Sequence, residues 1–116
     1  MTTVTETLTT AKKLLIDNGR IHMNLIDADG CMCALGAIGV ATNGASAVRE
    51  VGYAVFHEEG PALKAALALA GSLPDKYRNP EYARDISDVY HFNDRTDDDQ
   101  DVLDVFDKAI AAAQGE

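Results

Sequence analysis

The residues that could do chemistry are a pair of cysteines in the first third of the chain and a polar cluster much further along. Cys31 and Cys33 are separated by one residue, and His91 lies close to Asn93 and Asp94. A thiol at the N-terminus of a helix can have a lowered pKa and act as a nucleophile. Cys33 stands where a helix is expected to begin. The sequence therefore permits a small cysteine-dependent hydrolase or transferase that uses Cys33 with His91 or Asp94.

A simpler interpretation of the same residues is structural. Cys33 can be a small buried apolar residue, and His91 an exposed residue on a helix. The chain contains no P-loop, no dinucleotide-binding glycine pattern and no Gly-x-Ser-x-Gly motif. The sequence predicts no cofactor, and the structural interpretation is favoured over the catalytic one.

Metal binding is also disfavoured. The stretch Asp27-Ala-Asp-Gly30 resembles the start of a calcium loop, but the later ligands and the closing glutamate are missing. Cys31 and Cys33 could reach a zinc ion with His57 and His91 only if the fold brought all four together, and their spacing is unusual for structural zinc. We therefore predict no metal site.

The composition restricts the class of partner. The chain of 116 residues has a formal net charge of −9 and is 47% apolar. Such acidity argues against direct binding to a phosphate backbone or to an anionic membrane surface. It is compatible with a basic protein partner, or with an acidic mimic of nucleic acid. With no long apolar run and no signal peptide, the sequence predicts a reduced, cytoplasmic protein.

The elements that must position these residues are mainly helices. The apolar spacing predicts one domain over residues 1–116, mainly α with α+β character, in which four to five helices pack around a small β-hairpin at about residues 20–33. Asp29-Gly30 is expected at the hairpin turn, with Gly30 at positive φ. The glycine- and alanine-rich segment after Cys33 should be a helix that lets another backbone approach closely.

Capping and turn signals set the expected helix boundaries. A capping box at Thr3 and Glu6 begins a first helix that runs to Asn18. Thr96 is expected to cap the last helix, which should pack through Val102, Phe106 and Ile110. The other predicted helices are Ala34 to about Thr42, a segment capped by Ser46 that overlaps a possible strand at Tyr53–His57, a helix from Pro61, and a short helix from Glu81 to Asn93.

Three segments resemble a family of small uncharacterised proteins of actinobacteria and their phages, the DUF6197 family. They are Leu15–Gly19 at the end of the first helix, Asp29–Ile38, and Phe92–Asp94 before a last helix that ends in Lys108–Ala111. The family pattern has a tryptophan where this chain has Arg20, and another where it has Phe92. The resemblance marks Cys33, Gly36, Asn93 and Asp94 as its most recognisable positions, but it implies no activity.

A physical role is available for these positions. Asn93 and Asp94 separate two helices, and their side chains could bind backbone groups of the hairpin or of the helix that follows Cys33. Asp29, Gly30, Cys33, Gly36, Asn93 and Asp94 would then form a structural motif.

The function expected from the sequence is that of an accessory protein. We predict a small acidic protein, encoded by a phage, that binds another protein in the host cytoplasm and has no catalytic activity. The cysteine-dependent enzyme and the acidic nucleic-acid mimic remain the alternatives. The sequence does not determine the oligomeric state.

Overall fold

The first helix begins at a capping box, as its sequence predicts. In the computed structural model, which describes residues 3–22, 24–57, 59–74, 77 and 86–114, helix α1 spans Val4–Asn18. The Thr3 hydroxyl accepts a hydrogen bond from the Glu6 amide, and the Glu6 carboxylate accepts one from the Thr3 amide. Gly19, at a φ of 91°, ends the helix with its N–H bound to the Leu15 carbonyl.

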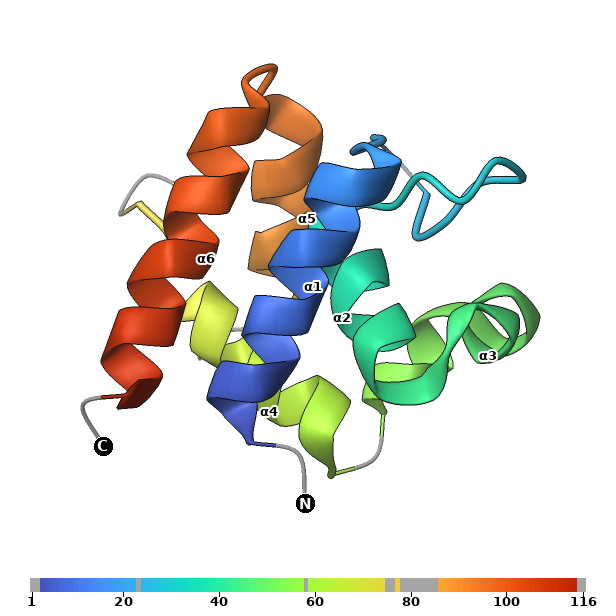
Figure 1. Ribbon diagram of the computed structural model, residues 1–116, viewed down its shortest axis with the longest axis horizontal. Coiled ribbons are helices and arrows are strands. Elements are labelled where there is room, and N and C mark those ends of the chain that lie inside the picture. Colours follow the sequence, from blue (N-terminus) through green and yellow to red (C-terminus); the bar gives the residue numbers. More distant parts are fainter. Residues whose placement is uncertain (1–2, 23, 58, 75–76, 78–85, 115–116) are drawn as a thin grey trace.

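Helix α2 spans Ala34–Asn43 and occupies the middle of the fold. Every residue from Ala34 to Gly39 is buried. The helix contacts α1, α3 (Ala45–Val51), α4 (Pro61–Ala70) and α5 (Ile86–Arg95). The small side chains of α2 allow these neighbours to pack closely around it (Figure 1).

Two predictions about the next segment are wrong. Helix α3 begins at Ala45, directly after Gly44, so that Ser46 lies inside the helix and makes no capping hydrogen bond. The possible strand at Tyr53–His57 is instead a 3₁₀-helix, η1, over Gly52–Phe56. Phe56 is buried in the core at the end of this short 3₁₀-helix, an element that is common as a connector between α-helices.

The last three helices pack on α1 and α2 in different ways: α4 contacts both, α5 contacts α2, and the last helix contacts α1. Pro61 begins α4, in agreement with its preference for a first helical turn. Residues 81–85 of the helix predicted from Glu81 lie outside the described residues. Helix α6 spans Asp99–Gln114, and its cap is Asp98 rather than Thr96, because the Asp98 carboxylate accepts the Gln100 amide at 2.9 Å.

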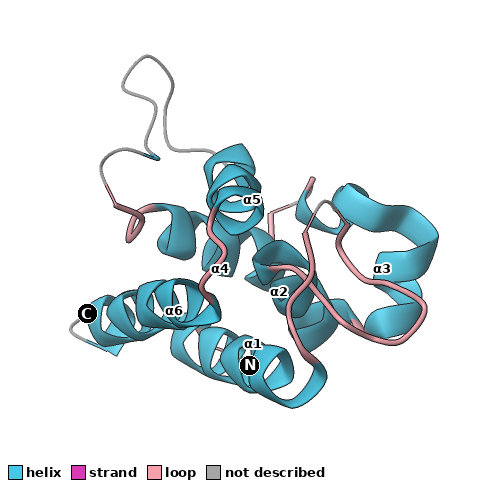
Figure 2. Cartoon of the chain, turned by 90° about the horizontal axis from the view of Figure 1, so that it is seen from above, coloured by secondary structure: helices cyan, strands magenta, loops and turns pink. Residues whose placement is uncertain are grey.

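The buried side chains form one hydrophobic cluster to which all six α-helices contribute. Phe106 of α6 is fully buried, and Val102 and Val105 flank it in the core. Helix α6 lies alongside α1, as both views show (Figures 1 and 2). Within the described residues, no helix is long and apolar enough to cross a membrane.

The predicted β-hairpin does not form, and the fold is therefore all-α in its described part, with six α-helices rather than four or five. Residues 20–33 contain two isolated bridges, in which Met32 pairs with Arg20 in a parallel sense and with Ile26 in an antiparallel sense. Because α2 begins at Ala34, the return segment has only three residues. Its hydrogen bonds are divided between the two ends of the outgoing loop, so no continuous ladder can form.

The turn itself was predicted correctly in position. Gly30 has a φ of 89°, and its N–H donates to the Asp27 carbonyl at 3.2 Å. The Asp27 carboxylate accepts from the amides of Asp29 and Cys31, each at 2.9 Å. Asp27 therefore acts as an Asx-turn residue and organises the loop that contains Asp29 and Gly30.

Candidate functional site

Cys33 caps the N-terminus of α2 from a buried position. Its Sγ accepts a hydrogen bond from the Gly36 amide at 3.3 Å, and the residue is 2% exposed. Burial raises the pKa of the thiol from 9.0 to about 11, although the amides at the helix start oppose this shift. The Asp94 carboxylate adds a smaller upward contribution to that pKa. Desolvation therefore outweighs the effect of the helix terminus, and Cys33 lacks the lowered pKa on which the catalytic alternative depended.

Asn93 connects three segments that are distant in the sequence. Its side chain is fully buried. The Oδ1 atom accepts from the Ala34 amide at 3.1 Å, and Nδ2 donates to the Ile21 carbonyl at 2.9 Å and to the Asp94 carboxylate at 3.3 Å. The contact with Ala34 is of the kind expected for a structural link between α5 and the start of α2.

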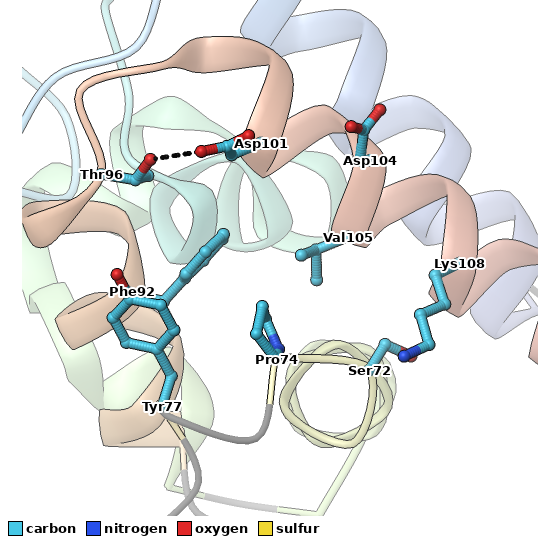
Figure 3. A pocket seen from close by; sticks show the side chains of 9 residues that line it. All are labelled: Ser72, Pro74, Tyr77, Phe92, Thr96, Asp101, Asp104, Val105 and Lys108. Atoms are coloured by element: carbon cyan, nitrogen blue, oxygen red, sulfur yellow. Dashed lines mark hydrogen bonds between the residues drawn. The ribbon is translucent and has the colours of Figure 1, made fainter.

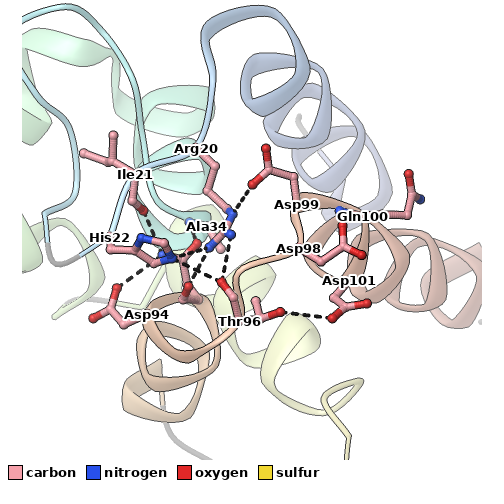
Figure 4. A network of polar contacts seen from close by, with 11 residues as sticks. Arg20, Ile21, His22, Ala34, Asp94, Thr96, Asp98, Asp99, Gln100 and Asp101 are labelled. Atoms are coloured by element: carbon pink, nitrogen blue, oxygen red, sulfur yellow. Dashed lines mark hydrogen bonds and ion pairs between the residues drawn. The ribbon is translucent and has the colours of Figure 1, made fainter.

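Arg20 forms the other half of this polar network (Figure 4), and the sequence analysis missed its role. Its side chain is only 4% exposed, and Nε pairs with the Asp99 carboxylate at 2.7 Å. Two further nitrogens donate to the carbonyls of Asn93 at 2.6 Å and Thr96 at 2.8 Å. These carbonyls lie at and just beyond the C-terminal end of α5, where a cation is favoured.

His22 completes the network on the solvent side. Its Nε2 lies 3.2 Å from an Arg20 nitrogen and 3.1 Å from the Thr96 carbonyl. The only sequence signal for this cluster was the presence of Arg20 where the family pattern has a tryptophan. That signal could not identify the carbonyls that the guanidinium would bind.

Gly36 explains the close approach predicted for the small-residue helix. A Cβ atom at this position would lie 1.8 Å from the Leu25 carbonyl oxygen. That carbonyl accepts the Cys33 amide at 3.2 Å, so the loop crosses directly over the first turn of α2. Only glycine leaves room for this crossing.

The candidate residues are therefore only partly brought together. Cys33, Gly36 and Asn93 meet around the start of α2, with Asp94 half-buried beside them. Asp29 lies at the exposed turn. His91 is exposed on α5, where its ring packs edge-on against Tyr90 at a centroid distance of 4.6 Å. Cys33 and His91 thus differ in environment, one enclosed in the core and the other facing solvent.

The fold does not bring together any three of Cys31, Cys33, His57 and His91, the residues that could have bound zinc. Among residues 3–22, 24–57, 59–74, 77 and 86–114, no three histidine, cysteine, aspartate or glutamate side chains lie close enough to hold a metal ion.

A cleft of about 540 Å³ opens elsewhere, between the end of α4, α5 and α6 (Figure 3). Phe92 and Tyr77 meet edge to face at a centroid distance of 4.9 Å, and Pro74 and Val105 continue the apolar lining. The polar lining consists of Ser72, Thr96, Asp101, Asp104 and Lys108. None of the candidate catalytic residues lines this cleft.

Comparison with known proteins adds a family but no activity. No curated protein and no solved structure matches the chain. The sequence profile of a family of unknown function, DUF6197, matches residues 1–112. The chain therefore belongs to the DUF6197 family.

Proposed function

We propose that this protein acts by binding another protein rather than by catalysis. The observation that carries the proposal is the cleft between α4, α5 and α6, which combines an apolar lining with acidic side chains and lacks the candidate nucleophile. Its volume lies in the range of about 300–1,000 Å³ that is typical of ligand sites. A cleft of this size and composition suits one or two side chains of a partner.

The enzymatic alternative has less support. A nucleophilic cysteine needs an accessible thiolate, whereas Cys33 is enclosed and has a raised pKa.

The nucleic-acid mimic also has less support, since Asp99 and Asp107 pair with Arg20 and Lys12. The charges of these two carboxylates are therefore balanced locally and add little to an acidic surface.

The cellular setting is part of the proposal. We place the protein in the cytoplasm, where the free thiols of Cys31 and Cys33 would stay reduced. We place its gene in a phage of an actinobacterial host because of the family resemblance.

Site-specific photocrosslinking in host cells tests the binding function. A benzophenone amino acid replaces the exposed Asp104 at the cleft in one variant and the exposed Glu50 on α3 in the control. We expect a discrete protein adduct from position 104 that is absent from position 50, and that persists in a Cys33→Ser background. Equal adducts from both positions, or none from position 104, would contradict binding through the cleft.

A further inference from the structure

The apolar part of the cleft is a nearly buried floor with a more open edge. Phe92 is 3% exposed and Val105 is 6% exposed, so their outer surfaces close the bottom of the cleft. Tyr77 is half-buried and Pro74 is exposed. Figure 3 shows these four side chains around a single space. An apolar side chain placed there would gain contact with two rings and a proline without any change in the core.

On the side of α6 the rim of the cleft carries two acidic side chains, Asp101 and Asp104, and one basic side chain, Lys108. Asp101 and Asp104 lie three residues apart, and therefore on one face of the helix. The Thr96 hydroxyl donates to Asp101 at 3.0 Å, and the Gln100 amide group donates to Asp104 at 2.8 Å. Within the described residues, neither carboxylate forms an ion pair. Both carboxylates are instead held in place by hydrogen bonds from neutral side chains.

We propose that the cleft binds a short basic segment of the partner protein, in which an apolar side chain is flanked by lysine or arginine. The apolar side chain lies on Phe92, Tyr77, Pro74 and Val105, and an adjacent cation is bound by Asp101 and Asp104. This inference rests on the proposed binding function and specifies its partner. Charge complementarity supports it, because the whole chain carries a net charge of −9 and would attract a basic segment from a distance.

Three synthetic peptides separate the two components of this recognition. The first, KRFLKR, carries an apolar pair between basic residues. The second, EEFLEE, keeps the apolar pair and reverses the charge, and the third, KRGGKR, keeps the charge and removes the apolar pair. Each is titrated into the isotope-labelled full chain while backbone amide resonances are followed by NMR. We expect only KRFLKR to give saturable shifts at Thr96, Asp104 and Lys108.

A matched pair of charge reversals tests the rim. Asp104→Lys should weaken binding of KRFLKR about threefold to tenfold, since it removes one exposed attraction and adds a repulsion. Glu50→Lys makes the same change in net charge on α3, away from the cleft, and should leave the affinity nearly unchanged. The amide spectrum of each variant reports whether it remains folded.

The relative affinities of the three peptides decide whether the cleft binds a basic segment. Equal binding of KRGGKR would show that charge alone acts, and equal binding of EEFLEE would show that the acidic rim is irrelevant. Either result, or the absence of shifts at the cleft with all three peptides, overturns the proposed basic segment. The broader binding function would still stand in that case if position 104 continued to give a specific photocrosslinked adduct in cells.

Discussion

Asn93 is the residue at which the chemical and the structural interpretations of this sequence diverge most clearly. An asparagine close to a histidine and an aspartate suggests an orienting group in a catalytic site. In the structure its side-chain amide is hydrogen-bonded to backbone groups of two other segments, the Ala34 N–H and the Ile21 carbonyl. A buried side chain that satisfies a helix N-terminus cannot be removed without leaving those groups unpaired.

We therefore expect Asn93→Ala to lower the free energy of unfolding by about 1–3 kcal/mol, the cost of leaving a buried polar partner unsatisfied. Urea denaturation measures this change. Asn24→Ala, at an exposed loop position, is the matched control and should have little effect. An Asn93→Ala variant as stable as the control would show that the link contributes nothing to the fold.

Cys33 provides a prediction about pH. Its thiol has a pKa of about 11 in the folded protein and an ordinary value of 9.0. The unfolded chain therefore loses this proton first as the pH rises. The contribution of this thiol to the free energy of unfolding is fully present below pH 9 and is lost by about pH 11. The loss attributable to this group is about 3 kcal/mol, since each of the two pKa units corresponds to about 1.4 kcal/mol.

The variant Cys33→Ser isolates this contribution, because a serine hydroxyl can cap the helix but does not titrate in this range. The stability of the wild-type chain should fall more steeply between pH 9 and 11 than that of the variant.

At neutral pH, Cys33 should also react more slowly with iodoacetamide than the half-exposed Cys31. Rapid alkylation of native Cys33 would return the enzymatic alternative to consideration.

At the scale of elements, the start of α2 depends on the loop that crosses it. Gly36→Ala should place a methyl group against the Leu25 carbonyl, and one of the two backbones must then move. We expect a destabilisation of about 1–3 kcal/mol or more, as for an overpacked core. Thermal unfolding followed by circular dichroism measures it.

Gly60→Ala is a suitable control for this substitution. Gly60 also precedes a helix, but no atom lies within 4 Å of an added Cβ, and its φ of 169° suits any residue. The control should therefore unfold at nearly the wild-type temperature. Equal unfolding temperatures for the two variants would contradict the close crossing of the Leu25 backbone over α2.

At the scale of the whole molecule, the excess of acidic residues opposes compaction. With 19 acidic and 10 basic residues, the folded chain carries like charges closer together than the unfolded chain does. Screening by salt should weaken this repulsion more than it weakens the exposed Lys12–Asp107 ion pair. We therefore expect Tm to rise as potassium chloride is added to a low-salt buffer.

Asp104→Lys makes the net charge two units less negative and offers a check on this argument. The variant should have a higher Tm than the wild type at low salt and a smaller increase on adding salt. A Tm that falls with salt in both proteins would mean that specific ion pairs, such as that of Arg20 with Asp99, dominate the electrostatics of the fold.

Helices with local signals could be predicted from residue types alone. The capping box of α1, the glycine that ends it and the proline that begins α4 act within a turn of helix, so their residues were sufficient to place them. The positive φ of Gly30 is likewise a property of one tight turn. The acidic character and the helical class also follow from composition and apolar spacing.

The nature of the candidate site, in contrast, depends on contacts between distant segments. The alternation of residues 20–26 suggested a strand, but a strand needs a partner, and the start of α2 left too few residues to supply one. The pKa of Cys33 depends on how deeply the other helices bury it, and burial outweighed the local effect of the helix terminus. The guanidinium of Arg20 binds carbonyls more than seventy residues away. Contacts of this range arise from packing, which no local pattern of residue types encodes.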